Sequence, residues 1–290
     1  IGRRQALQHL SVTAQLAARI VDETFTDAAR FAQTLAAQPS FHDALRQRAR
    51  AQLVQWLQQL LPLVSKVNRV IVATAQGEIL AVFPPAPGLT GQSLAQDEGF
   101  QGAQEGGWHP YVSAVHMEAE GSFEKAVEVV VPVEEDHAVL GVIQVQYRVE
   151  DVHSWLTKIS VEPDGFLYVV DHHDQLVVYP FQVLPGTPKV VSDWLPVAEP
   201  LSATGSTLIF RGGQHEQRWL AAVSAVGLTG WRVVAVQPER AVLRLLHQIL
   251  WPTGMLVGSL LALVFLLSVE LVRWRQMVSE RRGHSSTSSE

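Results

Sequence analysis

Four adjacent residues, Asp171, His172, His173 and Asp174, form the densest group of chemically versatile side chains in the sequence. Histidine and carboxylate groups are frequent ligands of zinc and other metals. Neighbouring side chains on a strand point to opposite faces, so these four residues are poorly placed to converge on one ion. A polar turn between two apolar strands explains the same pattern. We therefore predict a hairpin turn here, and we expect neither a metal site nor a cofactor.

Motifs that accompany enzyme activity do not occur in this sequence. The chain contains no cysteine, which excludes a thiol nucleophile. It also contains no GxSxG, HExxH, GxxxxGK[ST] or GxGxxG motif. Its histidines and acidic residues are scattered, and no spacing joins them into a catalytic triad. We predict no catalytic residues and no enzyme activity within this chain.

Two glutamines in an apolar segment are candidates for contacts with a bound small molecule. Gln144 and Gln146 lie on one face of residues 139–147 if that segment forms a strand. Two glutamines among branched apolar residues either point to solvent or line a cavity and form hydrogen bonds with a ligand. The alternation pattern leaves both interpretations open.

Aromatic side chains near these glutamines are candidates for the walls of such a cavity, because small-molecule sites are commonly lined by aromatic rings. Packing in the core is the competing role for each ring, and for Phe100 it is the more usual one. A strand over 111–118 would place Ser113 on the same face as Tyr111. The predicted ligand-binding residues are Phe100, Trp108, Tyr111, Ser113, His116, Glu128, Gln144 and Gln146.

The elements that position these residues begin with a long amphipathic helix. No Gly or Pro occurs from Gln5 to Gln38, and apolar residues recur at steps of three and four, which predicts one helix of about 30 residues. Pro39 ends this helix. Ser40 is a suitable N-cap for a second helix, which the sequence predicts over residues 41–61.

Short strands and turns follow in two groups with the same order of elements. The first group has predicted strands at 67–75, 78–83, 111–118, 125–133 and 139–147, and predicted helices at 97–105 and 149–159. The second has predicted strands at 165–170, 175–179, 207–211, 217–225 and 231–237. The first hairpin of each group ends with an aromatic residue and a proline, Phe83-Pro84 and Tyr179-Pro180. The sequence therefore predicts an α+β fold with two related antiparallel-sheet modules in series.

An uncharged apolar segment lies after the second module. Residues 249–269 contain no charged side chain, and a helix needs about 20 apolar residues to cross a bilayer. The arginines that follow this segment place its C-terminal side in the cytoplasm. These arginines are Arg273, Arg275, Arg281 and Arg282. We predict a helix across the inner membrane at 249–271, a cytoplasmic stub at 272–290, and an extracytoplasmic location for residues 1 to about 247.

Charge and helix patterns indicate which partners to expect. The net charge is −6 and no basic run is long, so we expect no nucleic-acid partner. The apolar stripe of the first helix packs either on its own domain or against a second copy of the chain, and the second arrangement would give a homodimer. The small residues of GMLVG at 254–258 favour a homodimer, because they allow close approach of membrane helices.

In these features the chain resembles the double Cache sensors of bacterial membrane receptors. The segments that carry the resemblance are LAAQPSF (35–41), GEILAVFP (77–84), DEGFQGAQEGGWHPYVSAV (97–115), VVVPVEEDHAVLGVIQV (129–145), FLYVVDHHDQLVVYP (166–180) and GWRVVAVQP (230–238), in the order of the family. The resemblance implies two PAS-like modules. It places a helical stalk at 1–62, a membrane-distal module with the ligand pocket at 63–160, and a membrane-proximal module that relays the signal at 161–244.

The resemblance implies that the chain senses a small molecule and supplies the input of a chemoreceptor, a sensor histidine kinase or a cyclic-di-GMP enzyme. The alternative is an interaction domain with an empty pocket that senses through a periplasmic protein. The amino-acid-binding branch of the family carries an arginine, a tryptophan and a tyrosine on the pocket helix, where this chain has Asp97-Glu98-Gly99-Phe100. It carries an aspartate on a late strand, where this chain has Gln146. We therefore expect a ligand other than a standard amino acid.

Overall fold

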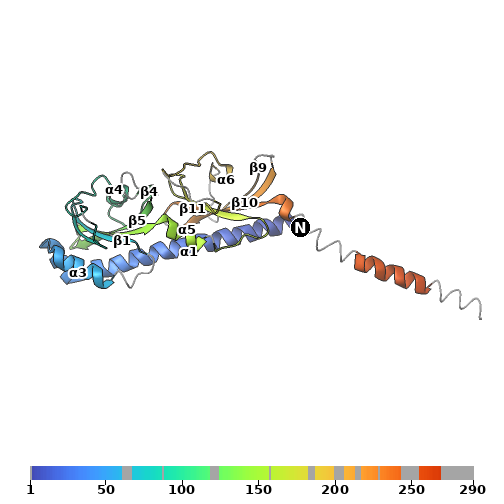
Figure 1. Ribbon diagram of the computed structural model, residues 1–290, viewed down its shortest axis with the longest axis horizontal. Helices are drawn as coiled ribbons and strands as arrows, with labels where there is room; N and C mark the ends of the chain where they lie inside the picture. Colours follow the sequence, from blue (N-terminus) through green and yellow to red (C-terminus); the bar gives the residue numbers. More distant parts are fainter. Residues whose placement is uncertain are drawn as a thin grey trace, which may run out of the picture. The chain divides into compact units, whose positions relative to one another are not determined.

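The computed structural model describes residues 2–60, 67–86, 88–117, 124–156, 158–181, 187–198, 206–212, 217–227, 229–242 and 255–268. Residues 3–239 form one compact unit, and residues 240–290 belong to a second unit. The first unit contains a long helix and two antiparallel sheets, as the sequence predicts (Figure 1).

The long helix, α1 (Gly2–Ala36), buries one apolar stripe along almost its whole length. Phe25 on this stripe contacts both sheets. Its ring packs edge-on against Tyr147 of the first sheet, at 6.0 Å between ring centroids, and against Trp231 of the second, at 5.0 Å. One helix therefore supplies part of the core of both modules.

Two short helices, α2 (Pro39–Arg46) and α3 (Arg50–Leu60), replace the single helix predicted over 41–61. The chain breaks the helix at Arg48, which adopts a left-handed conformation with φ of 52°. The prediction of Ser40 as an N-cap is also wrong, because Gln38 occupies that position and no side chain caps the helix.

The first sheet has the strand order β2-β1-β6-β5-β3, and β4 also pairs with β5. Its strands are β1 (Arg69–Thr74), β2 (Ile79–Phe83), β3 (Tyr111–Val112), β4 (His116–Met117), β5 (Lys125–Glu135) and β6 (Ala138–Arg148). The long β5–β6 hairpin turns at Asp136 and His137, both with positive φ, as a two-residue turn that matches the twist of the strands requires. Helix α4 (Glu98–Glu105) lies against this sheet, and α5 (Val149–Leu156) follows β6.

The second sheet repeats this order as β8-β7-β11-β10-β9. Its strands are β7 (Phe166–Val170), β8 (Leu176–Val178), β9 (Ser206–Gly212), β10 (Gln217–Val226) and β11 (Trp231–Pro238). In each sheet a short hairpin pairs with the last strand of a longer hairpin, so the two modules share one plan. The short helix α6 (Leu195–Ala198) was not predicted from the sequence.

The continuous strand predicted over 111–118 is interrupted in the structure, and residue 118 lies outside the described part of the chain. Residues 113–115 lie between β3 and β4 without strand pairing, because side chains bind two of their amide groups. Ala114 N donates to Glu98 Oε2 at 2.8 Å, and Val115 N donates to Asp171 Oδ2 at 2.9 Å.

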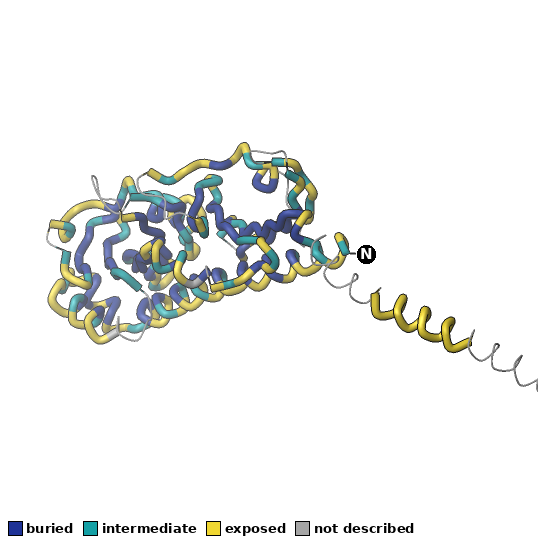
Figure 2. The backbone as a smooth tube through the Cα atoms, turned by 45° about the vertical axis from the view of Figure 1, so that its right-hand side comes forward, coloured by how far each residue is buried: buried dark blue, intermediate teal, exposed yellow. Residues whose placement is uncertain are grey.

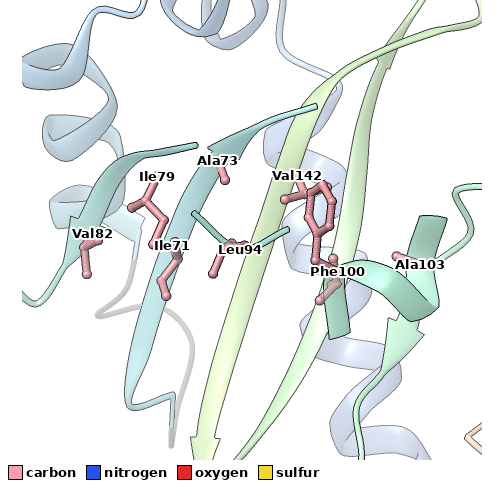
Figure 3. Close-up of a cluster of buried hydrophobic side chains, with 9 residues drawn as sticks. Ile71, Ala73, Ile79, Val82, Leu94, Phe100, Ala103 and Val142 are labelled. Atoms are coloured by element: carbon pink, nitrogen blue, oxygen red, sulfur yellow. The ribbon is translucent and has the colours of Figure 1, made fainter. Parts of the chain in front are cut away.

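Each sheet has its own buried apolar cluster. The central strands of both sheets are largely buried (Figure 2), whereas the edge strand β9 alternates between half-buried and exposed residues. In the first module, Phe100 from α4 points toward Val142 on β6 (Figure 3). This contact holds α4 over the middle of the sheet.

In the second unit, residues 255–268 form a helix that is exposed along its length. Among the described residues, no helix has both the length and the apolar character that a membrane span requires. The rest of the predicted membrane segment, 249–254 and 269–271, and the predicted stub lie outside the described residues.

Candidate functional site

A row of three polar residues crosses the middle of the first sheet. Arg69 on β1 and Glu128 on β5 are the direct cross-strand partners of Gln146 on β6, so the three side chains share one face. Arg69 Nη1 donates to Gln146 Oε1 at 3.1 Å, and Gln146 Nε2 donates to Glu128 Oε1 at 3.3 Å. The row therefore holds a guanidinium, an amide and a carboxylate side by side.

The next row on the same face contains Gln144, with Ile71 and Val130 as its cross-strand partners. Gln144 is 2% exposed and Gln146 is 4% exposed, so the interpretation in which they point to solvent does not hold. Gln144 Oε1 has no hydrogen-bond partner among the residues that the structure describes. A buried acceptor without a donor is costly, so this oxygen is a candidate acceptor for an N–H group from outside the described residues.

Asp97 brings a second carboxylate to this face from the start of α4. Its side chain accepts a hydrogen bond from Phe100 N at 3.1 Å and caps the helix. One potential ligand atom each from Asp97, His116 and Glu128 lies within 4.8 Å of the others, so the group has the donors to hold a divalent cation. His116 Nε2 and Glu128 Oε1 pair at 2.8 Å.

The charges in this cluster shift the pKa values of its members. Burial, together with the negative charge of Glu128, raises the pKa of Asp97 to about 6. Burial alone would lower the pKa of His116, but the hydrogen bond and the charge of Glu128 raise it to about 9. His116 is therefore an imidazolium ion at neutral pH, while Asp97 gains or loses its proton in a range close to neutrality.

Ser113 belongs to the same cluster. Its Oγ accepts a hydrogen bond from Glu128 N at 2.9 Å and lies 3.2 Å from Glu128 Oε2. The structure thus brings together Ser113, His116, Glu128 and Gln146 of the predicted set, with Gln144 in the adjacent row.

The three aromatic residues of the predicted set lie around α4. Phe100 is in the core and packs edge-on against Trp108, with ring centroids 5.6 Å apart. Tyr111 packs against Gly102, where an added Cβ would overlap its ring. The Tyr111 hydroxyl donates to Glu98 Oε1 at 2.6 Å, so this residue packs on the side of α4 that carries Glu98 and Gly102.

Glu98 and Asp171 join the two modules. His172 Nε2 lies 3.3 Å from Glu98 Oε1 and 3.1 Å from the Tyr111 hydroxyl. Asp171 is fully buried and accepts hydrogen bonds from His173 N and Gln175 N as well as from Val115 N. The predicted turn at 171–174 is confirmed, and it forms part of the contact between the modules.

Sequence reasoning missed Arg69, Asp97, Glu98, Asp171 and His172 as members of this network. An aspartate directly before a helix is a recognisable N-cap signal, so Asp97 could have been found. The other contacts depend on strand register and on the docking of one module on the other, which local sequence patterns do not report.

A family model described as the Cache domain matches residues 3–246. The chain belongs to the Cache domain family. The predicted resemblance to double Cache sensors is confirmed by this match, and sensing with signal input agrees with it. Cache domains of this type are extracellular, non-catalytic, ligand-binding parts of membrane receptors, which agrees with the predicted location and the predicted lack of enzyme activity for this part of the chain.

Several solved structures share the fold of this Cache domain. The ligand-binding domain of the Pseudomonas fluorescens chemoreceptor CtaA with L-isoleucine has a TM-score of 0.64 at 12% identity, covering 84% of this chain and 96% of that chain. The corresponding domain of the Pseudomonas aeruginosa chemoreceptor PctB with L-Gln has a TM-score of 0.62 at 15% identity, covering 80% and 91%. Comparison with functionally curated proteins gave no match.

The expectation of a ligand other than a standard amino acid is wrong. Similar domains were solved in complex with L-isoleucine, L-Gln and L-Arg, so a standard amino acid is a plausible ligand for this fold. The expectation rested on the absence of a carboxylate at the position of Gln146 and of a guanidinium on the pocket helix. In the structure, Glu128 and Arg69 supply both charges from the strands that flank Gln146.

Proposed function

We propose that the distal module binds an amino acid and that this binding is the input signal of a membrane receptor. The row of Arg69, Gln146 and Glu128 carries the proposal, because it offers a cation and an anion to the two charged groups of a zwitterion. The relatives solved with amino acids have the same fold, which supports this choice of ligand class.

The two ends of the row suggest an orientation for the ligand. The ammonium group would face Glu128 and Asp97, where two carboxylates share the single positive charge of His116, and the carboxylate group would face Arg69. The unpartnered Oε1 of buried Gln144 would accept a further hydrogen bond from the ligand. Trp108, Tyr111 and Ser113 are proposed to shape the site through α4 and the segment before β4.

Calorimetric titration of the full chain in detergent with each of the standard amino acids tests this proposal. At least one should bind saturably, and Glu128→Gln should weaken its binding about tenfold or more, because it removes a buried ion-pairing group. Glu134→Gln is the matched control, since Glu134 is an exposed residue on the same strand. The proposal fails if no amino acid binds, or if both variants bind as tightly as the wild type.

We further propose that the segment 249–271 anchors the chain in a membrane. Support comes from the helix at 255–268, in which every residue is uncharged and exposed, including ten large apolar side chains from Met255 to Leu267. Alkaline carbonate extraction of cell membranes should leave the chain in the membrane fraction. Release by carbonate would contradict an integral span.

A further inference from the structure

The proximal module contains a cavity of about 430 Å³, which is within the range of small-molecule sites. Aromatic residues from three strands and from loops of this module dominate its lining. They are Phe166, Tyr168, Tyr179, Trp194, Phe210 and Trp219. The cavity is separate from the polar cluster of the distal module, with which it shares no residue.

Neighbouring rings around this cavity stand almost perpendicular to one another. The interplanar angle is 85° between Phe166 and Tyr179, 81° between Tyr168 and Trp194, and 79° between Phe166 and Trp219. Rings at these angles turn their π faces in different directions. Several aromatic rings in different orientations therefore line one cavity, and sites that bind organic cations are commonly built from such sets of rings.

The structure already contains a cation at one of these rings. Lys189 Nζ lies 5.6 Å from the centroid of Trp194, within the distance at which an ammonium group is attracted to a ring. Two charged residues also line the cavity, Asp193 and Arg211. A negative carboxylate and a positive guanidinium group beside a set of aromatic rings match a ligand that carries both a positive and a negative group.

We propose that this cavity binds a quaternary ammonium zwitterion of the betaine type. Its trimethylammonium group contacts the aromatic rings and takes the place of Lys189 Nζ at Trp194, with Asp193 as the complementary charge. Its carboxylate pairs with Arg211. Burial of three methyl groups against the rings adds hydrophobic stabilisation that a small inorganic cation would lack.

Calorimetric titration of the full chain with glycine betaine and with 3,3-dimethylbutanoate tests this proposal. The second compound has the same shape and carboxylate but carries carbon in place of the charged nitrogen. Glycine betaine should bind saturably and about tenfold more tightly, because only it gains the cation–π attraction. Equal affinity of the two compounds, or no binding of glycine betaine, overturns the proposal.

Two variants locate the site. Trp194→Leu should abolish binding of glycine betaine, and Asp193→Asn, a conservative change at an exposed residue, should weaken it without loss of folding. Unchanged affinity in Asp193→Asn together with unchanged affinity in a folded Trp194→Leu overturns the assignment. Glu128→Gln in the distal module should leave the affinity for glycine betaine unchanged, so this test is independent of amino-acid binding.

Discussion

His172 Nε2 lies 3.3 Å from Glu98 Oε1, so a residue of the β7–β8 turn in the proximal module contacts the first residue of α4 in the distal module. Asp97, the neighbour of Glu98, belongs to the proposed ligand site. A shift of α4 on ligand binding would therefore reach the proximal module directly through this contact. A ligand transmits a signal only if it binds one arrangement of such a contact better than the other.

The Glu98–His172 pair should show measurable coupling in a double-mutant cycle. We expect Glu98→Gln and His172→Gln to be non-additive by about 0.5–1 kcal/mol in the free energy of unfolding, since both side chains are only partly buried. Chemical denaturation of the wild type, both single variants and the double variant measures this. Arg19 and Glu23, an exposed pair on α1, provide a control cycle with smaller coupling. Additive effects at Glu98 and His172 would remove the pair as a link between modules.

The same pair predicts a pH window for stability. The hydrogen bond with Glu98 raises the pKa of His172 above 6.5, so its contribution is complete below pH 6.5 and is lost as the pH rises through the raised value. Burial would raise the pKa of Glu98, but hydrogen bonds from His172, Tyr111 and Ala114 lower it below 4.5, so its contribution is complete above pH 4.5 and is lost as the pH falls through the lowered value.

The stabilisation by this pair is therefore greatest between pH 4.5 and 6.5. Thermal unfolding of the wild type and His172→Gln across pH should give the largest difference in Tm within this window, and a smaller difference at alkaline pH. A difference that is constant with pH would show that His172 acts through packing alone.

The strand pattern of both modules was predictable because alternating apolar residues and Gly, Pro or Asp turns are local signals. The break in the strand at Ser113–Val115 was not predictable. The carboxylates of Glu98 and Asp171 accept hydrogen bonds from backbone N–H groups in this segment, and these contacts come from distant parts of the chain. Residue type and strand alternation predict eight binding residues, and the structure brings four of them, Ser113, His116, Glu128 and Gln146, into contact. The role of Arg69 in the site was not predicted, because Arg69 is brought opposite Gln146 by the register of β1 and β6, which local sequence patterns do not show.

Gln144→Met should separate stability from ligand binding. Methionine has a similar shape but no buried acceptor, so the ligand-free variant should be more stable by about 1 kcal/mol. The same change removes a hydrogen bond to the proposed ligand, so amino-acid affinity should fall. Thermal unfolding and calorimetric titration of one preparation measure both effects. A variant that is less stable and binds normally would show that Gln144 serves the core and not the ligand.

Asp97 should make amino-acid binding depend on pH. Its pKa of about 6 means that its carboxylate loses charge just below neutrality, which weakens its attraction for the ligand ammonium group. Affinity should therefore rise between about pH 5 and 7 as Asp97 ionises. Asp97→Asn, which keeps an oxygen for the helix cap, should flatten this dependence. An unchanged pH profile in Asp97→Asn would assign the dependence to another group.

Gly102 should show opposite effects of one substitution in two backgrounds. Alanine in the middle of a helix is normally more stable than glycine by about 1 kcal/mol. At Gly102, however, the added Cβ would overlap the ring of Tyr111, so Gly102→Ala should destabilise the wild type and displace the ring from Glu98. In a Tyr111→Ala background the overlap is absent, and Gly102→Ala should stabilise the chain. Chemical denaturation of the four proteins measures this reversal, and a stabilising effect in both backgrounds would contradict the close packing of Tyr111 on α4.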